Sequence, residues 1–266
     1  MSERRLVIIP TYKEKENIER MIRKVLALET GETGETGPST SSGSGEVGKT
    51  GDKTGDYHLL VVDDGSPDGT AQIVKSLIAE YPGRLFILER SGKLGLGTAY
   101  LTGFKWGLAR SYEYFFEMDA DFSHNPDDLN RLYEACVSDG ADVSVGSRYV
   151  WGGSVTNWSL DRRVLSSWAS YYVRLITGMR IKDPTAGFVC YRRKVLETLN
   201  LDKIRFIGYA FQIEMKYKSK LAGFRIQEIP ITFTDRIAGI SKMSGGIIHE
   251  AIFGVLRLKW DSFWHT

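Results

Sequence analysis

The residues Phe115-Phe116-Glu117-Met118-Asp119-Ala120-Asp121-Phe122-Ser123-His124-Asn125-Pro126 pass from an apolar run into two acids and then toward a helix. The apolar run from Tyr114 to Met118 predicts a short buried strand, and Asn125 with Pro126 predicts a helix start. Asp119 and Asp121 then stand at the carboxyl end of that strand. In an open α/β sheet this is the edge where ligands bind.

Two carboxylates at one strand end repel each other unless a cation lies between them. Their hard oxygen ligands favour Mg²⁺ or Mn²⁺, an ion that keeps some waters and takes its other ligands from a substrate's phosphates. The same residues also fit a helix cap with one spare surface acid. These residues alone leave both interpretations open.

Composition limits the class of protein. The chain has 266 residues, 42% hydrophobic and 26% charged, which is typical of a soluble globular protein. A formal net charge of +2 gives no reason to expect a nucleic-acid partner. No apolar run approaches the roughly 20 residues that span a bilayer, and we expect no signal peptide. Cys136 and Cys190 are predicted to be buried thiols in a reducing compartment.

Apolar runs alternate with helical segments through the first half of the chain. The predicted strands are residues 6–9, 59–62, 85–88, 114–118 and 143–145. The predicted helices are residues 14–28, 70–81, 95–108 and 127–137. Strands that are nearly all apolar, with helices between them, indicate an α/β fold with a mostly parallel sheet covered on both faces. Gly95 and Gly97 lie after the third strand and lack a third glycine, so we interpret them as a tight helix start and not as a dinucleotide site.

Two further regions have a different character. Residues 29–56 are rich in Gly, Ser and Thr and predict a flexible insertion, with a recognition tail as the alternative. The second half of the chain predicts helices at 162–177, 211–221 and 247–260 and strands at 185–191 and 225–234. Pro230 places the last strand at an edge. The expected apolar stripe of the helix at 162–177 is Leu165, Trp168, Ala169, Tyr172 and Ile176. The final helix either packs on the core or lies on a membrane surface.

Three polar clusters follow the predicted parallel strands, and their convergence favours a binding site over isolated turns. They are Pro10 to Glu14, Asp63 with Asp64, and Asp119 with Asp121. A sugar nucleotide needs acceptors for its base or ribose, a metal for its diphosphate, and cations for the leaving charge. Arg236 and Lys242, in the polar segment 235–246, are the candidate cations.

Four motifs resemble the polyprenyl-phosphate (dolichyl-phosphate) mannosyltransferases, which are inverting family 2 glycosyltransferases of GT-A fold. The motifs are residues 7–14 (VIIPTYKE), 62–70 (VDDGSPDGT), 93–100 (KLGLGTAY) and 118–121 (MDAD). Asp235-Arg236 followed by Ser241-Lys242 adds to the likeness, which runs from Leu6 to about Leu258 apart from the insertion. The resemblance implies GDP-mannose as donor, a polyprenyl phosphate as acceptor, and Mg²⁺ or Mn²⁺ as cofactor.

The resemblance also implies roles for single residues. The guanosine site would be lined by Pro10, Tyr12, Glu14, Val62 and Asp64. The metal and diphosphate would be held by Asp119, Ala120 and Asp121, with Ser123 where some relatives place a glutamine ligand. Arg148 would face the phosphates, Arg162 and Ser166 would bind the acceptor phosphate, and Arg236 and Lys242 would clamp the diphosphate. Of these, Asp121, Arg148 and Arg236 are the expected catalytic residues.

The expected organisation is one GT-A domain over residues 1–266, with a nucleotide-sugar half (about 1–150) and an acceptor half with a C-terminal extension (about 151–266). We expect a peripheral protein at the cytosolic face of a membrane, with a membrane-anchoring partner protein as a possibility. Transfer of glucose or another sugar is an alternative activity within the family. A catalytically silent regulatory subunit that binds a sugar nucleotide is an alternative outside the enzymes.

Overall fold

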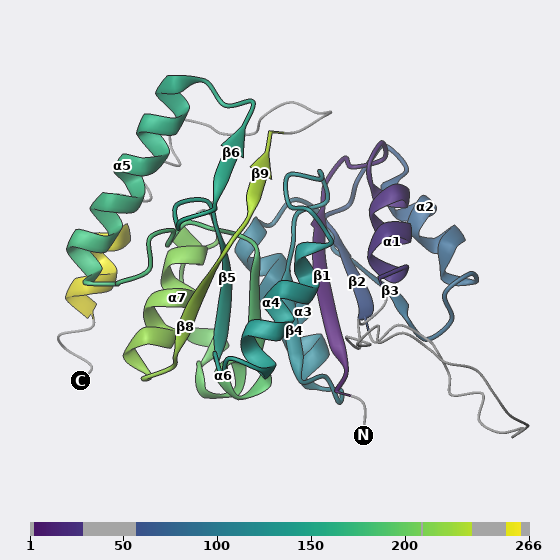
Figure 1. Cartoon of the computed structure of the whole chain (residues 1–266). Coiled ribbons are helices and arrows are strands. Elements are labelled where there is room, and N and C mark those ends of the chain that lie inside the picture. The colour runs from purple at the N-terminus through teal and green to yellow at the C-terminus, as the bar shows by residue number, and fades with distance from the viewer. Residues whose placement is uncertain (1–2, 29–56, 209, 236–253, 262–266) are drawn as a thin grey trace, which may run out of the picture.

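The computed structural model describes residues 3–28, 57–208, 210–235 and 254–261 (Figure 1). In this described part, the main sheet has the strand order β3-β2-β1-β4-β7-β5-β8. Its strands are β1 (Arg5–Thr11), β2 (Tyr57–Asp63), β3 (Leu85–Glu89), β4 (Tyr114–Glu117), β5 (Val143–Ser147), β7 (Val189–Arg192) and β8 (Ile226–Pro230). A small second sheet joins β6 (Ser154–Thr156) and β9 (Thr232–Thr234). The predicted insertion at 29–56 lies outside the described residues.

The main sheet is mostly parallel, as the alternation of strands and helices predicts. Strand β1 pairs in parallel with β2 and β4, and β5 pairs in parallel with β8. Strand β7 runs antiparallel between β4 and β5. It occupies only the end of the strand expected at 185–191. Because β4 and β5 point the same way, their carboxyl ends share one edge with those of β1 and β2.

Helices cover both faces of the main sheet (Figure 1). On one face, alternate β1 residues such as Val7 and Ile9 pack against α1 (Ile18–Leu26), α2 (Thr70–Ile78) and α4 (Asp128–Val137). On the other, Leu6 and Ile8 pack against α3 (Leu96–Leu108), α6 (Arg193–Thr198) and α7 (Ala210–Leu221). A short 3₁₀ helix, η1 (Leu201–Lys203), joins the last two. The alternation follows from the period of two in a strand.

Helix α5 (Leu160–Thr177) stands beside the sheet, next to a helix at 254–261 (Figure 1). A third core cluster holds them together, with Val173 of α5, Tyr217 of α7 and Val255 among its members. The apolar stripe expected on α5 is buried only in part. Leu165, Trp168 and Ala169 are exposed, whereas Tyr172 and Ile176 pack against the cluster. No helix in the described ranges is long and apolar enough to cross a membrane.

The strand predicted at 225–234 is two strands. Strand β8 ends at Pro230 on the edge of the main sheet, as expected of a proline, and β9 joins the small sheet. The chain changes sheet at Ile231, whose backbone N–H donates to the Ser147 carbonyl over 3.1 Å. The final helix expected at 247–260 is described from residue 254.

Glycines let α3 lie close to the strands beneath it. A Cβ at Gly103 would lie 2.6 Å from Ile8 Cγ2, and one at Gly107 would lie 2.5 Å from Phe115 Cε1. Neither position has room for a methyl group, because both neighbours are buried in the sheet. This close approach fixes α3 against β1 and β4, and so helps to fix the position of the loop that follows β4.

We predict that Gly107→Ala lowers the free energy of unfolding by about 1–3 kcal/mol, because the added methyl overpacks the contact with Phe115. Chemical denaturation monitored by tryptophan fluorescence measures the change. Gly92→Ala is the matched control, since a Cβ there would meet nothing within 4 Å. The two variants showing equal losses would contradict the close packing of α3.

Candidate functional site

The polar clusters after β1 and β2 meet at the carboxyl edge of the sheet. Thr11 and Asp63 are register partners, and Thr11 Oγ1 donates to Asp63 Oδ2 over 2.9 Å. The backbone N–H of Asp64 donates to the Thr11 carbonyl over 2.9 Å. The N–H of Lys13, which has a φ of 60°, donates to Ser66 Oγ over 3.0 Å. The two loops therefore form one connected surface, as their positions in the sequence predicted.

The two acids after β2 have different hydrogen-bond partners. Asp63 is buried and accepts from both the backbone N–H (2.9 Å) and the hydroxyl (2.6 Å) of Ser66, so it closes the turn. Asp64 accepts from Arg90 Nε over 2.6 Å. Arg90 also donates to Thr98 Oγ1 over 2.8 Å, at the start of α3. Sequence reasoning missed Arg90, although a basic residue directly after β3 faces the same edge.

The other residues expected around the guanosine differ in exposure. Pro10, Tyr12 and Glu14 are half-buried, and the N–H of Glu14 donates to Thr70 Oγ1 over 3.1 Å. Val62 is fully buried within the sheet, where it pairs with Pro10. Its side chain therefore belongs to the core, and only its backbone lies near the edge.

The loop after β4 presents two carboxylates and one hydroxyl. Asp121 is 4% exposed and accepts from the Ser123 N–H over 3.0 Å, whereas Asp119 is half-buried. Phe122, between Asp121 and Ser123, has a φ of 60°, a strained value for a residue other than glycine. Within the described part of the chain, Ser123 Oγ is buried without a hydrogen-bond partner. Such an unpaired buried hydroxyl is costly unless something in the functional state binds it.

The His124 ring packs beside this loop and accepts a hydrogen bond from it. Its Nδ1 accepts from the Asp119 backbone N–H over 3.3 Å. The ring stacks on Phe188 at 4.9 Å between ring centroids and meets Phe233 edge-on at 5.5 Å. The N–H of Thr234, beside Phe233, donates to the Ser123 carbonyl over 3.2 Å. The loop is therefore held by β7 and β9 as well as by its own turn.

The donor set after β4 fits a hard divalent cation that keeps open positions. Among the described residues, no group of three or more His, Cys, Asp and Glu side chains is arranged to enclose a metal. Asp119, Asp121 and Ser123 offer fewer ligands, and all of them are oxygen atoms. The Ser123 hydroxyl among them has no hydrogen-bond partner in the described residues. Mg²⁺ is usually held by one or two carboxylates, with waters and substrate phosphates completing its shell.

Arg148 lies in a buried ion pair that the sequence did not predict. It donates from Nε to Asp183 Oδ2 over 2.7 Å and from Nη2 to Asp183 Oδ1 over 2.6 Å. Burial raises the pKa of Asp183, but the Arg148 charge and its hydrogen bonds lower it by more, so the net pKa lies below its usual value. Arg148 also lies 5.5 Å from the centroid of Phe233, and this ring connects it to His124.

Arg162 and Arg148 share one aromatic ring. Their guanidinium carbons lie 4.3 Å and 5.5 Å from the ring centroid of Trp158. Arg162 donates to Asp235 Oδ2 over 2.7 Å, and Ser166 Oγ accepts from Tyr149 Oη over 2.7 Å. The structure thus brings the residues expected at the acceptor together, with Trp158 as a residue that sequence reasoning missed. Arg236 and Lys242 lie outside the described residues.

Two buried ionisable side chains, Glu117 and Lys216, lie beneath the edge. Burial raises the pKa of Glu117 to about 8 and lowers that of Lys216 to about 8, while each charge favours the other. Lys216 Nζ donates to the Ala186 carbonyl over 2.6 Å and to Gln212 Oε1 over 3.1 Å. Tyr100 Oη and Tyr191 Oη, which lie close enough to feel the Glu117 charge, are buried without hydrogen-bond partners. Buried polar side chains as well as apolar ones therefore lie beneath the carboxyl edge of the sheet.

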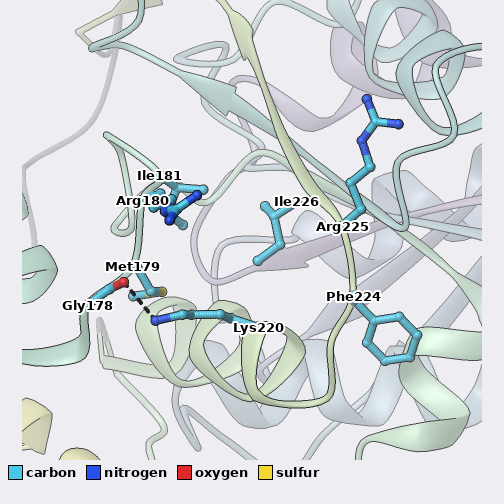
Figure 2. Close-up of a pocket in the computed structure, with 8 residues that line it drawn as sticks. All are labelled: Gly178, Met179, Arg180, Ile181, Lys220, Phe224, Arg225 and Ile226. Atoms are coloured by element: carbon cyan, nitrogen blue, oxygen red, sulfur yellow. Dashed lines mark hydrogen bonds between the residues drawn. The ribbon is translucent and has the colours of Figure 1, made fainter.

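A cavity of about 590 Å³ lies elsewhere in the molecule (Figure 2). Its lining includes Gly178 after α5, Lys220 of α7, and Arg225 and Ile226 where β8 begins. Lys220 Nζ donates to the Gly178 carbonyl over 2.7 Å, whereas Arg225 points away from it (Figure 2). Because β8 runs parallel to β5, this cavity lies at the edge opposite the aspartates. It is separate from the candidate site.

Comparisons with known proteins show the family to which the chain belongs. The profile of glycosyl transferase family 2 matches residues 6–199. A polyprenol monophosphomannose synthase of Mycolicibacterium smegmatis is 45% identical over 254 residues, which cover 96% of this chain and 86% of the relative. An undecaprenyl-phosphate mannosyltransferase of Micrococcus luteus is 41% identical over 259 residues, covering 97% and 95%.

Solved structures share the fold at low identity. A glucosyl-3-phosphoglycerate synthase from Mycobacterium tuberculosis, in complex with Mn²⁺, UDP and phosphoglyceric acid, superposes with a TM-score of 0.63 at 15% identity, covering 97% of this chain and 78% of that one. A mannosyltransferase from Pyrobaculum calidifontis, in complex with GDP-Man and Mn²⁺, gives 0.55 at 15%, covering 98% and 74%. The predicted GT-A fold is therefore confirmed. With the family profile over most of its length, the chain belongs to glycosyltransferase family 2.

Proposed function

We propose that the protein transfers mannose from GDP-mannose to a polyprenyl phosphate, with inversion at the sugar, giving polyprenyl phosphate mannose and GDP. The observation that carries this proposal is the meeting of an aspartate loop with two arginines that share Trp158. The first would bind a diphosphate through a divalent cation, and the second suits an incoming phosphate. Relatives named for polyprenyl-phosphate mannose transfer, at 41–45% identity over nearly the whole chain, support the choice of substrates.

Asp119, Asp121 and Ser123 would hold the divalent cation, Mg²⁺ or Mn²⁺. When bound, the cation would neutralise the charge that develops on the departing diphosphate. Ala120 brings its backbone to the same loop, between the two acids. The Ser123 hydroxyl is buried and has no partner among the described residues, and the turn that carries it is closed by the hydrogen bond from the Ser123 N–H to Asp121.

The donor's guanosine would lie along the β1 and β2 loops. Asp64 offers carboxylate oxygens fixed by Arg90, and Pro10, Tyr12 and Glu14 form the half-buried wall beside it. Val62 would contribute through its backbone, because its side chain is buried. Arg236, which directly follows Asp235, and Lys242 would close on the diphosphate from the segment after β9.

The acceptor phosphate would bind to Arg162 and Ser166, with Arg148 between acceptor and donor. A phosphate monoester is already anionic at neutral pH, so it can attack the anomeric carbon without a strong general base. Catalysis would then rest on orientation by Asp121, Arg148 and Arg236 and on stabilisation of the leaving charge. Transfer of glucose or another sugar is the alternative, and a silent regulatory subunit is the non-enzymatic one.

Helix α5 would rest on the bilayer that holds the lipid acceptor. Its exposed apolar side chains recur every three or four residues and form one row, here called the apolar row: Leu160, Val164, Trp168, Tyr171 and Leu175. A row of this size facing solvent is typical of an interaction surface. Peripheral binding at the cytosolic face of a membrane follows from this proposal, with or without an anchoring partner protein.

The loop that would hold the metal depends on a neutral histidine. Burial lowers the pKa of His124 from 6.5 to about 4, and nearby Asp121 and Asp183 offset this only in part. The neutral ring keeps Nδ1 available to accept from the Asp119 N–H. A protonated ring would lose this acceptor and place an unpaired charge between Phe188 and Phe233.

The first prediction tests the activity. We expect the purified protein to label polyprenyl phosphate from GDP-[¹⁴C]mannose with Mn²⁺ or Mg²⁺, and Asp121→Ala to lower the rate roughly a thousandfold or more, since it removes a cation ligand. Lipid extraction and scintillation counting measure the transfer. Asp202→Ala, an exposed acid of η1, is the control. Label from UDP-glucose instead would favour the glucosyltransferase, and no label from any donor would favour the regulatory subunit.

The second prediction tests the apolar row. We expect Trp168→Gln with Leu175→Gln to weaken binding to phosphatidylcholine vesicles by roughly tenfold or more, because each side chain is 67% exposed and would insert into the bilayer. Co-sedimentation with vesicles measures the binding. Leu221→Gln, 56% exposed at the end of α7, is the matched control. Unchanged sedimentation of the double variant would argue against membrane contact by α5.

The third prediction concerns pH. The folded pKa of His124 lies below the unfolded value, so its stabilising contribution is fully present above about pH 6.5 and is lost as the pH falls to about 4. His124→Phe keeps the stacking but takes up no proton. We expect the free energy of unfolding of the wild type, relative to His124→Phe, to fall by about 3 kcal/mol between pH 7 and pH 4. Urea denaturation in metal-free buffer measures it; a difference independent of pH would show that His124 is not buried in neutral form.

A further inference from the structure

A groove of about 210 Å³ lies between α5 and the body of the protein, one to two turns beyond Ser166. It is lined by Tyr149, Ser167, Ser170, Tyr171, Arg174 and Lys182. Ser170 and Arg174 continue the row that starts with Arg162 and Ser166, because each follows the previous one at a spacing of four residues. The hydrogen bond from Tyr149 to Ser166 joins the groove to the proposed acceptor site.

Two polar groups at the groove lack hydrogen-bond partners among the residues that the structure describes. Ser170 is 3% exposed, and its Oγ is buried without a hydrogen bond. Arg174 Nε is also buried without one. A buried donor left unpaired is costly, so native proteins pair almost all such groups with protein, water or ligand. These two groups lie one turn apart on α5 and line the same groove, which points to a shared ligand.

The charge of the groove selects an anion. Arg174 and Lys182 are its charged lining residues, and neither side chain forms an ion pair among the described residues. The nearby carboxylate of Glu228 is occupied by the backbone N–H groups of Lys182 (2.7 Å) and Asp183 (2.9 Å). The groove's volume of about 210 Å³ far exceeds the roughly 15 Å³ that a single water needs. A phosphate group would supply acceptors for all three side chains.

We propose that Ser170, Arg174 and Lys182 form a second phosphate-binding subsite, which receives a lipid phosphate beside the bilayer. The inference builds on the proposed lipid-acceptor function. Tyr171 lines the groove and also belongs to the apolar row, so a bound headgroup would have its chains directed toward the bilayer. The phosphate comes either from the acceptor lipid on its way to Arg162 and Ser166, or from a phospholipid of the membrane.

The larger cavity of Figure 2 makes a weaker case for an anion site. The Lys220 ammonium there already donates to the carbonyls of Thr177 (3.2 Å) and Gly178 (2.7 Å), which end α5. Its role as a cap for the helix accounts for its position. Arg174 and Ser170 have no comparable role within the chain.

The test compares binding of the full chain to three kinds of vesicle: phosphatidylcholine alone, with phosphatidylglycerol, and with polyprenyl phosphate. We expect Arg174→Gln to weaken binding to at least one of the two anionic vesicles, in which no choline offsets the phosphate charge, by roughly tenfold, as for loss of a charged hydrogen bond, and Ser170→Ala to weaken it less. Arg163→Gln is the matched control, because this arginine lies on the same helix and donates to the Val155 carbonyl outside the groove. Melting temperatures check that the variants fold.

The vesicle that loses affinity identifies the source of the phosphate. A loss confined to polyprenyl phosphate assigns the subsite to the acceptor, and should raise the acceptor KM with the donor KM unchanged. A loss with phosphatidylglycerol assigns it to a membrane lipid. Equal losses for Arg174→Gln and Arg163→Gln, or no loss for Arg174→Gln, would overturn the subsite. Absence of mannose transfer by the wild type would refute the proposed function and leave the binding result standing.

Discussion

The repulsion between the carboxylates of Asp119 and Asp121 is the constraint around which this edge of the sheet is built. The loop that carries them cannot move to separate the two carboxylates, because contacts on several sides hold it in place. Phe122 keeps a φ of 60°, His124 accepts from the Asp119 N–H, and Thr234 donates to the Ser123 carbonyl. Backbone strain of this kind persists only where the surrounding structure fixes it. The core beneath, with α3 tight against β1 and β4, supplies that rigidity. Under the proposed function, the oxygens would therefore be in place before a cation binds, which is the condition for strong electrostatic stabilisation of a charged leaving group.

The two arginines near the aspartate loop are already neutralised by carboxylates. Arg148 pairs with Asp183 and Arg162 pairs with Asp235, while both lie near the ring of Trp158. Under the proposed function, an arriving phosphate would exchange one anionic partner for another, or add to an existing pair, and would not need to desolvate a bare cation. The two pairs differ in burial. Asp183 is fully buried and Arg148 nearly so, whereas Arg162 and Asp235 are each about one third exposed. Breaking a buried ion pair is far more costly than breaking an exposed one. Arg148 is therefore suited to a fixed position, and Arg162 is suited to a ligand that binds and dissociates.

Much of this arrangement follows from the sequence, because the signals involved are local. Apolar runs ended by acids predicted the strands and the edge at which Thr11, Asp63 and Asp119 gather. The residues that complete the site are distant in sequence and carry no local signal. Asp183 reaches Arg148 from the loop before β7, a strand whose antiparallel direction no pattern in its few residues predicts, and Arg90 reaches Asp64 from the carboxyl end of the neighbouring β3. Helical periodicity identified α5 but not which face would be buried. Trp168 and Leu165 are apolar and exposed, while Ser170 is polar and buried. Residues 29–56, Arg236 and Lys242 stay predictions outside the described structure.

In α5 the usual placement of polar and apolar side chains is reversed, and under the proposed function this reversal would link the lipid to the sugar transfer. In a helix packed on a soluble core, the apolar side chains face inward and the polar ones face water. Here the row Arg162, Ser166, Ser170 and Arg174 faces the body of the protein, and the apolar row faces outward. Only the carboxyl-terminal part of the helix, with Val173 and Thr177, is fastened to α7 and the helix at 254–261. Such a helix is stable in water at the cost of exposed apolar surface, and that cost is removed where a bilayer covers the surface. Under the proposed function, its inward row would form a polar path from the membrane to Arg148. A phosphate would follow this path while its hydrocarbon chain stays in the lipid.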